Sequence, residues 1–429
     1  MCRVKAESSN VMFIAGLLFS VAFVAACSTP DTGETPQTPG VTVFEGARLI
    51  VGDGSEPIEN AVFIVENDRF TAVGRSEELD LPPGAVHVDL TGKTVTPAII
   101  DSHKHLADTR EALVDQLEHF AYYGVGVATS LGRDVGEMPL EVRDAIIPNA
   151  ARFRTAGVGI TGPEPGRTEI PYWITTEDEA RTAVQEQAAR NVDLVKIWVD
   201  DRDGQFQKPS PALYGAVIDE AHAHNLRVTA HVFLLADAKG LLRAGIDAFA
   251  HGIRDQDVDE EVIELFREHP NVFLVPNLPD RGVAVDLSWL SGTIAADELE
   301  EMQAAATDRP AAQETFGIQA RNLARLHAEG VRIAFGTDGA APWNATIEME
   351  DMVAAGMTPS AVIEAATRNS ANLLQLTDVG TVETGKSADF IVLDANPLDD
   401  ITNMRQIASV YLRGTAVDRA AFRERRSVQ

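Results

Sequence analysis

Histidine and lysine side chains stand at positions of this sequence where metal chemistry would need them. His103 and His105 lie two residues apart in the segment Asp101-Ser-His-Lys-His105. In a strand, residues i and i+2 point to the same side, so both imidazoles can hold one metal ion. Lys196 stands inside the apolar run Leu194-Val-Lys-Ile-Trp-Val199, where an unpaired charge is costly. Imidazole ligands suit Zn²⁺ and similar divalent ions.

Three more candidate ligands stand at the end of other apolar segments or directly after them. His231 and His251 each end such a segment, and Asp338 lies in Gly336-Thr-Asp-Gly339. Each residue alone has an ordinary explanation: a hydrogen-bonded core histidine for His251, a helix N-cap for Asp338, a buried ion-pair partner for Lys196. Their joint placement at the ends of separate apolar segments is what predicts a metal site.

The elements that must position these side chains form one long alternating region. Between about Thr96 and Gln375, strand-like apolar runs alternate with helical stretches, which is typical of a parallel sheet. The candidate strands cover residues 98–105, 125–131, 152–157, 194–199, 227–232, 247–251, 272–276 and 332–337. We therefore predict an α/β fold with a (β/α)8, TIM-like barrel over residues 96–379, whose functional residues lie at the carboxyl ends of its strands. The long stretch Asn277–Gly330 is expected to carry extra helices.

Short β-like segments stand on both sides of this region. Residues 41–95 and residues 380–425 contain brief apolar runs separated by Gly, Asn and Asp turn signals. We expect them to form a small β-sandwich domain, built from the N- and C-terminal segments together.

The beginning of the chain has the layout of an export signal. Residues 11–26 form an uncharged, mostly apolar run that is shorter than the roughly 20 residues of a transmembrane helix. The run ends in Val24-Ala-Ala-Cys27, which resembles the lipobox of bacterial lipoproteins. We predict a signal peptide over residues 1–26, lipidation of Cys27, and a flexible tether over residues 27–40. The expected location is the outer membrane, facing the periplasm; plain secretion and an uncleaved anchor are the alternatives.

Charge and cysteine content exclude several partners and ligands. The 429 residues include 65 acidic and 36 basic ones, a formal net charge of −29. Nucleic acid is therefore not an expected partner, because phosphate binding needs a basic face. Membrane contact is expected only through the lipid on Cys27, not through a polybasic patch. Of the two cysteines, Cys2 lies in the removed segment, so metal binding falls to His, Asp and Lys.

With these motifs established, the chain resembles the amidohydrolase superfamily across nearly all of residues 41–425. The motifs that carry the resemblance are Thr96-Pro-Ala-Ile-Ile-Asp-Ser-His-Lys-His105, Val195-Lys-Ile197, Thr229-Ala-His231, Phe249-Ala-His-Gly252, Gly336-Thr-Asp338, Ala365-Ala-Thr-Arg-Asn-Ser-Ala-Asn372 and Gly380-Thr-Val-Glu-Thr-Gly-Lys-Ser-Ala-Asp389. The sequence looks most similar to the imidazolonepropionase-like branch, which includes Xaa-Pro dipeptidases. A lysine on the fourth strand resembles the binuclear subgroup, in which that lysine is carboxylated.

The resemblance implies two divalent metal ions, with Zn²⁺ as the expected kind. His103, His105 and Asp338 would hold the buried ion, and His231 and His251 would hold the second. Carboxylated Lys196 would bridge the two ions. An ammonium group cannot bind a cation whereas a carbamate can, and burial lowers the pKa of a lysine enough to make carboxylation plausible.

The sequence departs from the family pattern at a few positions. Lys104 stands between the two histidines, where a small or apolar residue is usual; by alternation it points away from the metals, and we expect its side chain to extend to the rim. Residues 341–346 lack a histidine that is often found there, and Ala98 replaces a common glycine. Six residues lie in or near loops that could line the pocket, although ordinary packing is favoured for each: Tyr122, Tyr123, Arg133, Arg167, Tyr172 and Trp343.

The function that this pattern favours is hydrolysis of an amide or peptide bond in a small substrate, such as a dipeptide or an N-acyl amino acid. The nucleophile would be a hydroxide bridging the two ions, with Asp338 as general base and then general acid. The alternatives are a hydrolase of cyclic amides or lactones, and an inactive metal-bearing lipoprotein that only binds a ligand. Small molecules or short peptides are the expected partners; formation of a homo-oligomer stays open.

Overall fold

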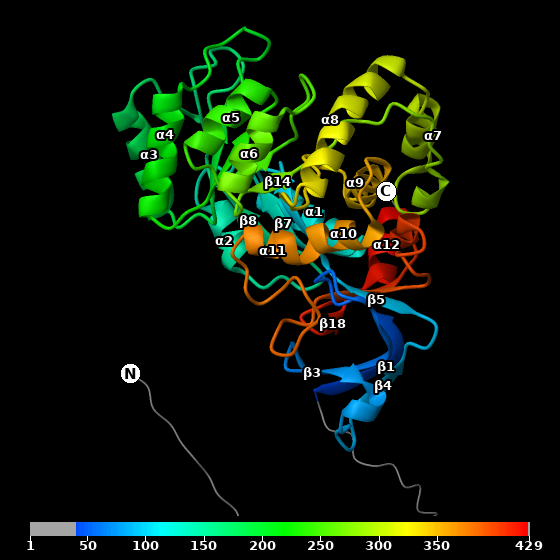
Figure 1. Ribbon diagram of the computed structural model, residues 1–429. Coiled ribbons are helices and arrows are strands. Elements are labelled where there is room, and N and C mark those ends of the chain that lie inside the picture. Colours follow the sequence, from blue (N-terminus) through cyan, green and yellow to red (C-terminus); the bar gives the residue numbers. More distant parts are fainter. Residues whose placement is uncertain (1–39, 428–429) are drawn as a thin grey trace, which may run out of the picture. The chain divides into compact units, whose positions relative to one another are not determined.

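The computed structural model describes residues 40–427, and Figure 1 shows the arrangement of their elements. The predicted signal peptide, Cys27 and most of the tether lie outside these residues. Within residues 40–427, no helix is long and apolar enough to span a membrane.

Both ends of the described chain join in one sheet of eight strands, at the bottom of Figure 1. The strands follow the order β18-β17-β16-β5-β1-β2-β3, and β4 pairs with β1. Their bounds are β1 (Val41–Leu49), β2 (Ile58–Glu66), β3 (Arg69–Arg75), β4 (Val86–Asp89), β5 (Thr94–Pro97), β16 (Phe390–Leu393), β17 (Ile407–Leu412) and β18 (Thr415–Ala416).

This sheet folds over an aromatic core. Strand β1 changes partner at Gly46, whose φ of +86° only glycine adopts readily: its first half pairs with β4 and its second half with β5. The ring of Phe44 stacks on Phe63 at 5.0 Å between centroids, and Phe63 meets the edge of Phe390 at 5.2 Å. Because β2 and β16 are not neighbours in the sheet, these contacts pack its two halves together. The predicted small β domain formed by both terminal segments is confirmed.

The barrel contains the eight predicted strands, each shorter than expected. They are β6 (Ile99–Lys104), β7 (Val125–Ser130), β8 (Arg152–Thr155), β11 (Val195–Trp198), β12 (Val228–His231), β13 (Ala248–Ala250), β14 (Phe273–Val275) and β15 (Arg332–Ile333). Two further two-residue strands extend this sheet: β9 (Ile160–Thr161) pairs with β11, and β10 (Tyr172–Trp173) pairs with β9. All pairings are parallel, and the N–H of Ser102 donates to the Phe335 carbonyl at 3.0 Å between β6 and the residues that follow β15. The predicted TIM-like barrel is confirmed.

Helices alternate with the barrel strands and cover them. Their bounds are α1 (Arg110–Tyr122), α2 (Met138–Asp144), α3 (Glu177–Ala189), α4 (Pro211–Ala223), α5 (Leu235–Arg243), α6 (Glu260–Glu268), α7 (Ala296–Ala305), α8 (Pro310–Ala328), α9 (Asn344–Ala354), α10 (Pro359–Glu364), α11 (Ser370–Leu373) and α12 (Arg419–Ser427). Side-chain caps start several of them: Thr109 accepts the N–H of Ala112, and Thr176 with Glu179 forms a capping box.

The stretch that was expected to carry extra helices does so. It contains the short helix η2 (Ser288–Leu290), α7 and α8, and the last two are drawn in yellow in Figure 1. The other short helical turns are η1 (Ser76–Glu78), η4 (Ile401–Arg405) and the π-helical turn η3 (Ala365–Asn369) between α10 and α11. Directly after η3, the Ser370 hydroxyl accepts the N–H of Phe335 at 2.9 Å and thereby supports the chain beyond β15.

Candidate metal centre

The predicted ligands lie in barrel strands or in the segments that directly follow them in the chain. His103 belongs to β6 and Lys196 to β11, and His231 is the last residue of β12. His105 and His251 directly follow β6 and β13, and Asp338 lies five residues beyond the end of β15. Strands that are far apart in the chain thus bring the whole set to one end of the barrel.

The carboxylate of Asp338 joins the two histidines of the first strand. Its Oδ1 atom lies 3.2 Å from Nε2 of His103 and 3.1 Å from Nε2 of His105. Donor atoms of these three residues all lie within 4.8 Å of one another. Two imidazoles and one carboxylate at this spacing form a donor set that suits Zn²⁺ or a similar ion.

The other predicted residues continue the same cluster. Nε2 of His251 lies 3.7 Å from Oδ2 of Asp338, and the His251 ring lies 4.5 Å from that of His231 between centroids. The Nζ atom of Lys196 lies 3.5 Å from Nε2 of His103. The structure therefore places all six predicted side chains in one continuous group.

Burial sets the protonation states of this cluster. It lowers the pKa of His103 and of His251 well below the ordinary value and that of His231 to about 4, so these imidazoles are neutral and able to bind metal at neutral pH. Burial also raises the pKa of Asp338, but hydrogen bonding to His105 and nearby positive charge outweigh it and bring the pKa to about 2. Asp338 is therefore ionised at neutral pH, as a ligand or a general base must be.

Lys196 is a buried amine without a direct ion pair. Its side chain is fully buried, and in the described part of the chain no carboxylate lies within ion-pair distance. Burial lowers the pKa of Lys196 to about 7, so a neutral amine is accessible near neutral pH. An amine in this state fits a chemical role within the cluster better than a structural ion pair.

The backbone is strained at this site. His251, Asn277 and Asp338 have φ values of +78°, +42° and +57°, in the left-handed region that non-glycine residues seldom adopt. Each such residue costs about 1–3 kcal/mol, and such strain persists where the surroundings hold it for function. The strain coincides with the metal-ligand cluster.

Asn277 is a site residue that the sequence reasoning missed. Its Oδ1 accepts a hydrogen bond from Nδ1 of His103 at 2.7 Å and another from the backbone N–H of His251 at 3.2 Å. This leaves Nε2 of His103 free to face a metal ion. The next residue, Leu278, donates its N–H to the buried Glu348 at 3.0 Å. The sequence did contain a signal for Asn277: it directly follows the predicted strand 272–276, at the end of a barrel strand where functional residues are expected. That strand itself ends in no charged or imidazole side chain.

The prediction that Lys104 extends to the rim is wrong. Its side chain is fully buried, with Nζ 2.9 Å from Oδ2 of Asp101, 2.9 Å from Oγ1 of Thr337 and 3.1 Å from the Gly339 carbonyl. Alternation does turn Lys104 away from the metal ligands, but Phe120 of α1 closes that side, with its ring centroid 4.3 Å from Nζ. Lys104 thus connects the first strand to the loop that carries Asp338.

A cavity of about 390 Å³ opens onto the ligands. Arg133 and Arg167, two of the residues considered for the pocket, line it together with Glu164, Arg202 and Trp198. The four aromatic candidates do not line this cavity: Tyr122, Tyr123 and Trp343 form an apolar cluster with Phe422, and the Tyr172 hydroxyl donates to Glu186.

One wall of this cavity contains a chain of ion pairs that connects His231, Asp200, Arg202 and Glu164. Oδ2 of Asp200 lies 2.9 Å from Nε2 of His231 and 2.5 Å from Nη1 of Arg202. The Nε atom of Arg202 in turn lies 3.0 Å from Oε1 of the buried Glu164. The sequence analysis did not predict this chain of ion pairs. The charged run Asp200-Asp-Arg-Asp203, directly after the fourth strand, was the feature that could have indicated it. A carboxylate on the outer nitrogen of His231 orients that imidazole toward the cluster.

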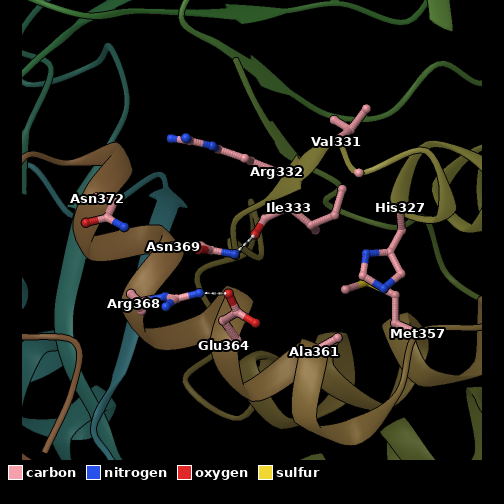
Figure 2. A pocket seen from close by; sticks show the side chains of 11 residues that line it. His327, Val331, Arg332, Ile333, Met357, Ala361, Glu364, Arg368, Asn369 and Asn372 are labelled. Carbon is pink, nitrogen blue, oxygen red and sulfur yellow. Dashed lines mark hydrogen bonds and ion pairs between the residues drawn. The ribbon is translucent and has the colours of Figure 1, made fainter. Parts of the chain in front are cut away.

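Among the other cavities of the described residues, two are larger than the one at the ligands. One, of about 700 Å³, is largely apolar and lies beside α7 and α9. The other, of about 420 Å³, lies near the start of β15; Figure 2 shows Asn369 bonded to the Ile333 carbonyl and Arg368 paired with Glu364 at its edge. Neither is lined by a predicted ligand, whereas His105, His231 and Asp338 line the cavity that Arg133 and Arg167 border, so that cavity is the candidate substrate pocket.

Comparisons with known proteins show the family of this chain. The model of the family described as "Amidohydrolase family" matches residues 94–417. Ochratoxinase of Aspergillus niger is 26% identical over 420 residues, which cover 84% of this chain and 82% of the ochratoxinase. Imidazolonepropionase of Cereibacter sphaeroides is 27% identical over 380 residues, covering 80% of this chain and 91% of that protein.

A solved structure is similar over the whole barrel and small domain. It is described as a prolidase from Bifidobacterium longum and superimposes with a TM-score of 0.74 at 28% identity. The similarity covers 90% of this chain and 99% of that one.

Replacing Lys104 tests its structural role. Lys104→Met leaves the fully buried Asp101 without its cation, and we expect a loss of about 3–5 kcal/mol in the free energy of unfolding. Urea unfolding measures the loss. The control is Lys93→Met, which removes a lysine whose ion pair with Asp394 is exposed and should cost less than about 1 kcal/mol. Equal midpoints for wild type and Lys104→Met would contradict the role.

Proposed function

Because this chain belongs to the amidohydrolase family, we propose that it is a metal-dependent hydrolase of an amide or peptide bond in a small substrate, such as a dipeptide or an N-acyl amino acid. The observation that carries the proposal is the His103–His105–Asp338 donor group beside an unpaired buried Lys196, at the mouth of the barrel. The likeness to a prolidase favours an amide bond over an ester. A cavity of about 390 Å³ limits the substrate to a small molecule or short peptide.

The proposed cofactor is a pair of divalent ions, with Zn²⁺ as the expected kind. His103, His105 and Asp338 would hold one ion, and His231 and His251 would hold the other, with carboxylated Lys196 between them. Neutral imidazoles, an ionised carboxylate and an amine with a pKa of about 7 support this assignment. Such ions, when bound, lower the pKa of water and polarise a carbonyl group.

The residues of the chain perform the remaining steps. The ionised Asp338 accepts a proton from the attacking water and returns it to the leaving nitrogen, so that a neutral amine departs. Its carboxylate is held for this role by the strained loop that Lys104 and Thr337 fasten to β6. Asn277 holds the ring of His103 in one orientation, and Asp200 does the same for His231.

The proposal includes export as a lipoprotein. The support is the lipobox-like Val24-Ala-Ala-Cys27 and the apolar run before it, which lie outside the described residues. Mass spectrometry of the mature protein should find a lipid on Cys27 as its first residue, and Cys27→Ser should release the protein from the membrane fraction. An unprocessed N-terminus would contradict this part of the proposal.

The test of the activity is a substrate screen followed by one substitution. The metal-loaded protein is assayed against Xaa-Pro and Xaa-Arg dipeptides, N-acyl amino acids, cyclic amides and lactones. On the best amide substrate, Asp338→Asn should lower kcat by about 10²–10⁴-fold, because the proton acceptor is lost. The matched control Asp219→Asn, whose side chain is 71% exposed on α4, should keep wild-type kinetics.

Three results would contradict the proposed function. Full activity of Asp338→Asn would exclude the proton-transfer role. Turnover confined to cyclic amides or lactones would favour the alternative hydrolase, and binding without turnover would indicate an inactive ligand-binding protein.

Metal content tests the bridging role of Lys196. Elemental analysis of the wild type should find close to two divalent ions per chain. Lys196→Ala should hold one ion or fewer, because the bridge between the two sites is lost. A wild type that holds a single ion, unchanged by Lys196→Ala, would exclude the bridge.

A further inference from the structure

A separate cavity of about 390 Å³ lies beside helix α12, which is drawn in red in Figure 1, and none of the predicted metal ligands lines it. Residues of α12, of the carboxyl end of α1 and of η2 contribute to its walls, and we call it the α12 cavity. Among the described residues that line it are three arginines, Arg405, Arg419 and Arg423, and one acidic residue, Asp394. The partners of these four side chains decide what the α12 cavity can bind.

Two of the four charges are already balanced. Arg405 donates two hydrogen bonds to the buried carboxylate of Glu350, at 2.7 and 2.6 Å. The carboxylate of Asp394 pairs with Nζ of Lys93 at 2.6 Å. The other two arginines of the α12 cavity have no carboxylate within ion-pair distance in the described part of the chain. Their positive charges are therefore unbalanced.

Contacts with carbonyl groups and with one tyrosine hold these two guanidinium groups in place. Nε of Arg419 donates to the Tyr122 carbonyl at 3.0 Å, and its Nη1 donates to the Ile407 carbonyl at 2.5 Å. Nε of Arg423 donates to the Tyr122 hydroxyl at 2.6 Å. Nη2 of Arg419 and both terminal nitrogens of Arg423 have no hydrogen-bond partner among the described residues, so these donors remain for a ligand.

The two guanidinium groups lie close together although their charges repel each other. Arg419 and Arg423 are four residues apart on α12, a spacing that puts both side chains on one face of the helix. Burial, with a contribution from the nearby charge of Arg423, lowers the pKa of Arg419. Like charges at this spacing destabilise a helix. An anion bound between the two groups would remove this repulsion.

The same helix shows that the chain balances its other arginines. Nη2 of Arg425 lies 2.6 Å from Oε2 of Glu118, and Arg426 pairs with Asp115. Both ion pairs join α12 to α1. In a chain with 65 acidic and 36 basic residues, an unbalanced pair of arginines needs a reason of its own, and the cavity in front of the pair supplies one.

Two adjacent guanidinium groups are best matched by a dianion. A phosphate group carries a charge of about −1.5 to −2 at neutral pH and has three acceptor oxygens. Guanidinium groups bind phosphate through paired hydrogen bonds. The side chains of Ser291 and Trp289 line the same cavity, which is larger than a phosphate ion, so a small organic group on the phosphate can be accommodated as well.

We propose that Arg419 and Arg423 bind a phosphate monoester in the α12 cavity. This binding site is separate from the metal centre, and the inference does not depend on the proposed amide hydrolysis. The phosphate can belong to a small soluble ester or to a lipid headgroup, because both present the same dianion.

Binding of phenyl phosphate to the metal-loaded wild type tests the site by calorimetry. Phenyl phosphate should bind at least about tenfold more tightly than benzoate, because benzoate carries a single negative charge. Vesicles of phosphatidylcholine with and without phosphatidic acid form a second arm. Binding only to vesicles that contain phosphatidic acid would assign the phosphate to a lipid, and binding of phenyl phosphate would assign it to a soluble ester. Equal affinities for phenyl phosphate and benzoate, with no preference for phosphatidic acid, would exclude the site.

Substitution of Arg423 assigns the binding to the α12 cavity. Arg423→Met should raise the Kd for the preferred ligand about 10- to 100-fold, because the free donors of one guanidinium group are lost. Arg423→Lys, which keeps the charge without the planar donor pair, should give an intermediate Kd. The matched control is Arg426→Met, which removes an arginine of the same helix that is paired with Asp115 and should keep the wild-type Kd. An unchanged Kd in both Arg423 variants would overturn the inference.

A phosphate can also bind to metal ions, so the metal centre needs its own variant. Asp338→Asn changes a predicted metal ligand and should retain the binding that Arg423→Met loses. Loss of binding in Asp338→Asn but not in Arg423→Met would place the phosphate at the metal centre and contradict the α12 site.

Discussion

The contact of one carboxylate with imidazoles from separate strands is the constraint on which the rest of the structure depends. Asp338 meets His103 and His105 within 3.2 Å and His251 at 3.7 Å, and it does so from a left-handed backbone conformation. A strained residue keeps its position only if its neighbours are fixed. The N–H of Asp338 donates to the His103 carbonyl at 2.7 Å, and the buried Lys104 holds the residues on both sides of Asp338.

The small β domain supports the same cluster from the opposite end of the first strand. Strand β5 pairs with β1 and β16 in that domain and leads directly into β6, which carries His103. The N–H of Ala98, between the two strands, donates to the Asp389 carbonyl at 3.0 Å. Because the two ends of the chain form this domain together, the C-terminal segment helps to set where the first barrel strand begins. The C-terminal motif that ends at Asp389 therefore helps to position the strand that carries the predicted ligand His103.

The sequence predicted the strands and the six candidate ligands because both depend on local signals. Alternation and the rule for strand ends placed His103, His105 and Asp338 on one face without any tertiary information. The roles of Asn277 and Lys104 depend on groups distant in the chain, which no local pattern contains. Alternation correctly turned Lys104 away from the ligands, but only the fold shows that α1 closes that side and that Asp101 supplies the counter-charge. The last strand is shorter than predicted because its extent also depends on a distant segment. Beyond Ile333 the chain is joined to β6 only by isolated hydrogen bonds, such as that from the Ser102 N–H to the Phe335 carbonyl, and not by a continuous strand pairing.

The distribution of charge around the pocket follows from the distances over which charges act. The chain carries a net charge of −29, yet charges on its outer surface are screened beyond about 8 Å at physiological salt. Charged groups that line the cavity lie within that distance of a ligand in the cavity, and the ions of the solvent screen them less. Glu164 pairs with Arg167 and Arg202, and Asp200 pairs with Arg202 and contacts Nε2 of His231, so carboxylates balance the positive charge of Arg202 beside His231. Arg133, three residues beyond β7, also lines the cavity and has no ion pair among the described residues, so the positive charge of the pocket is not fully balanced by carboxylates even in an acidic protein.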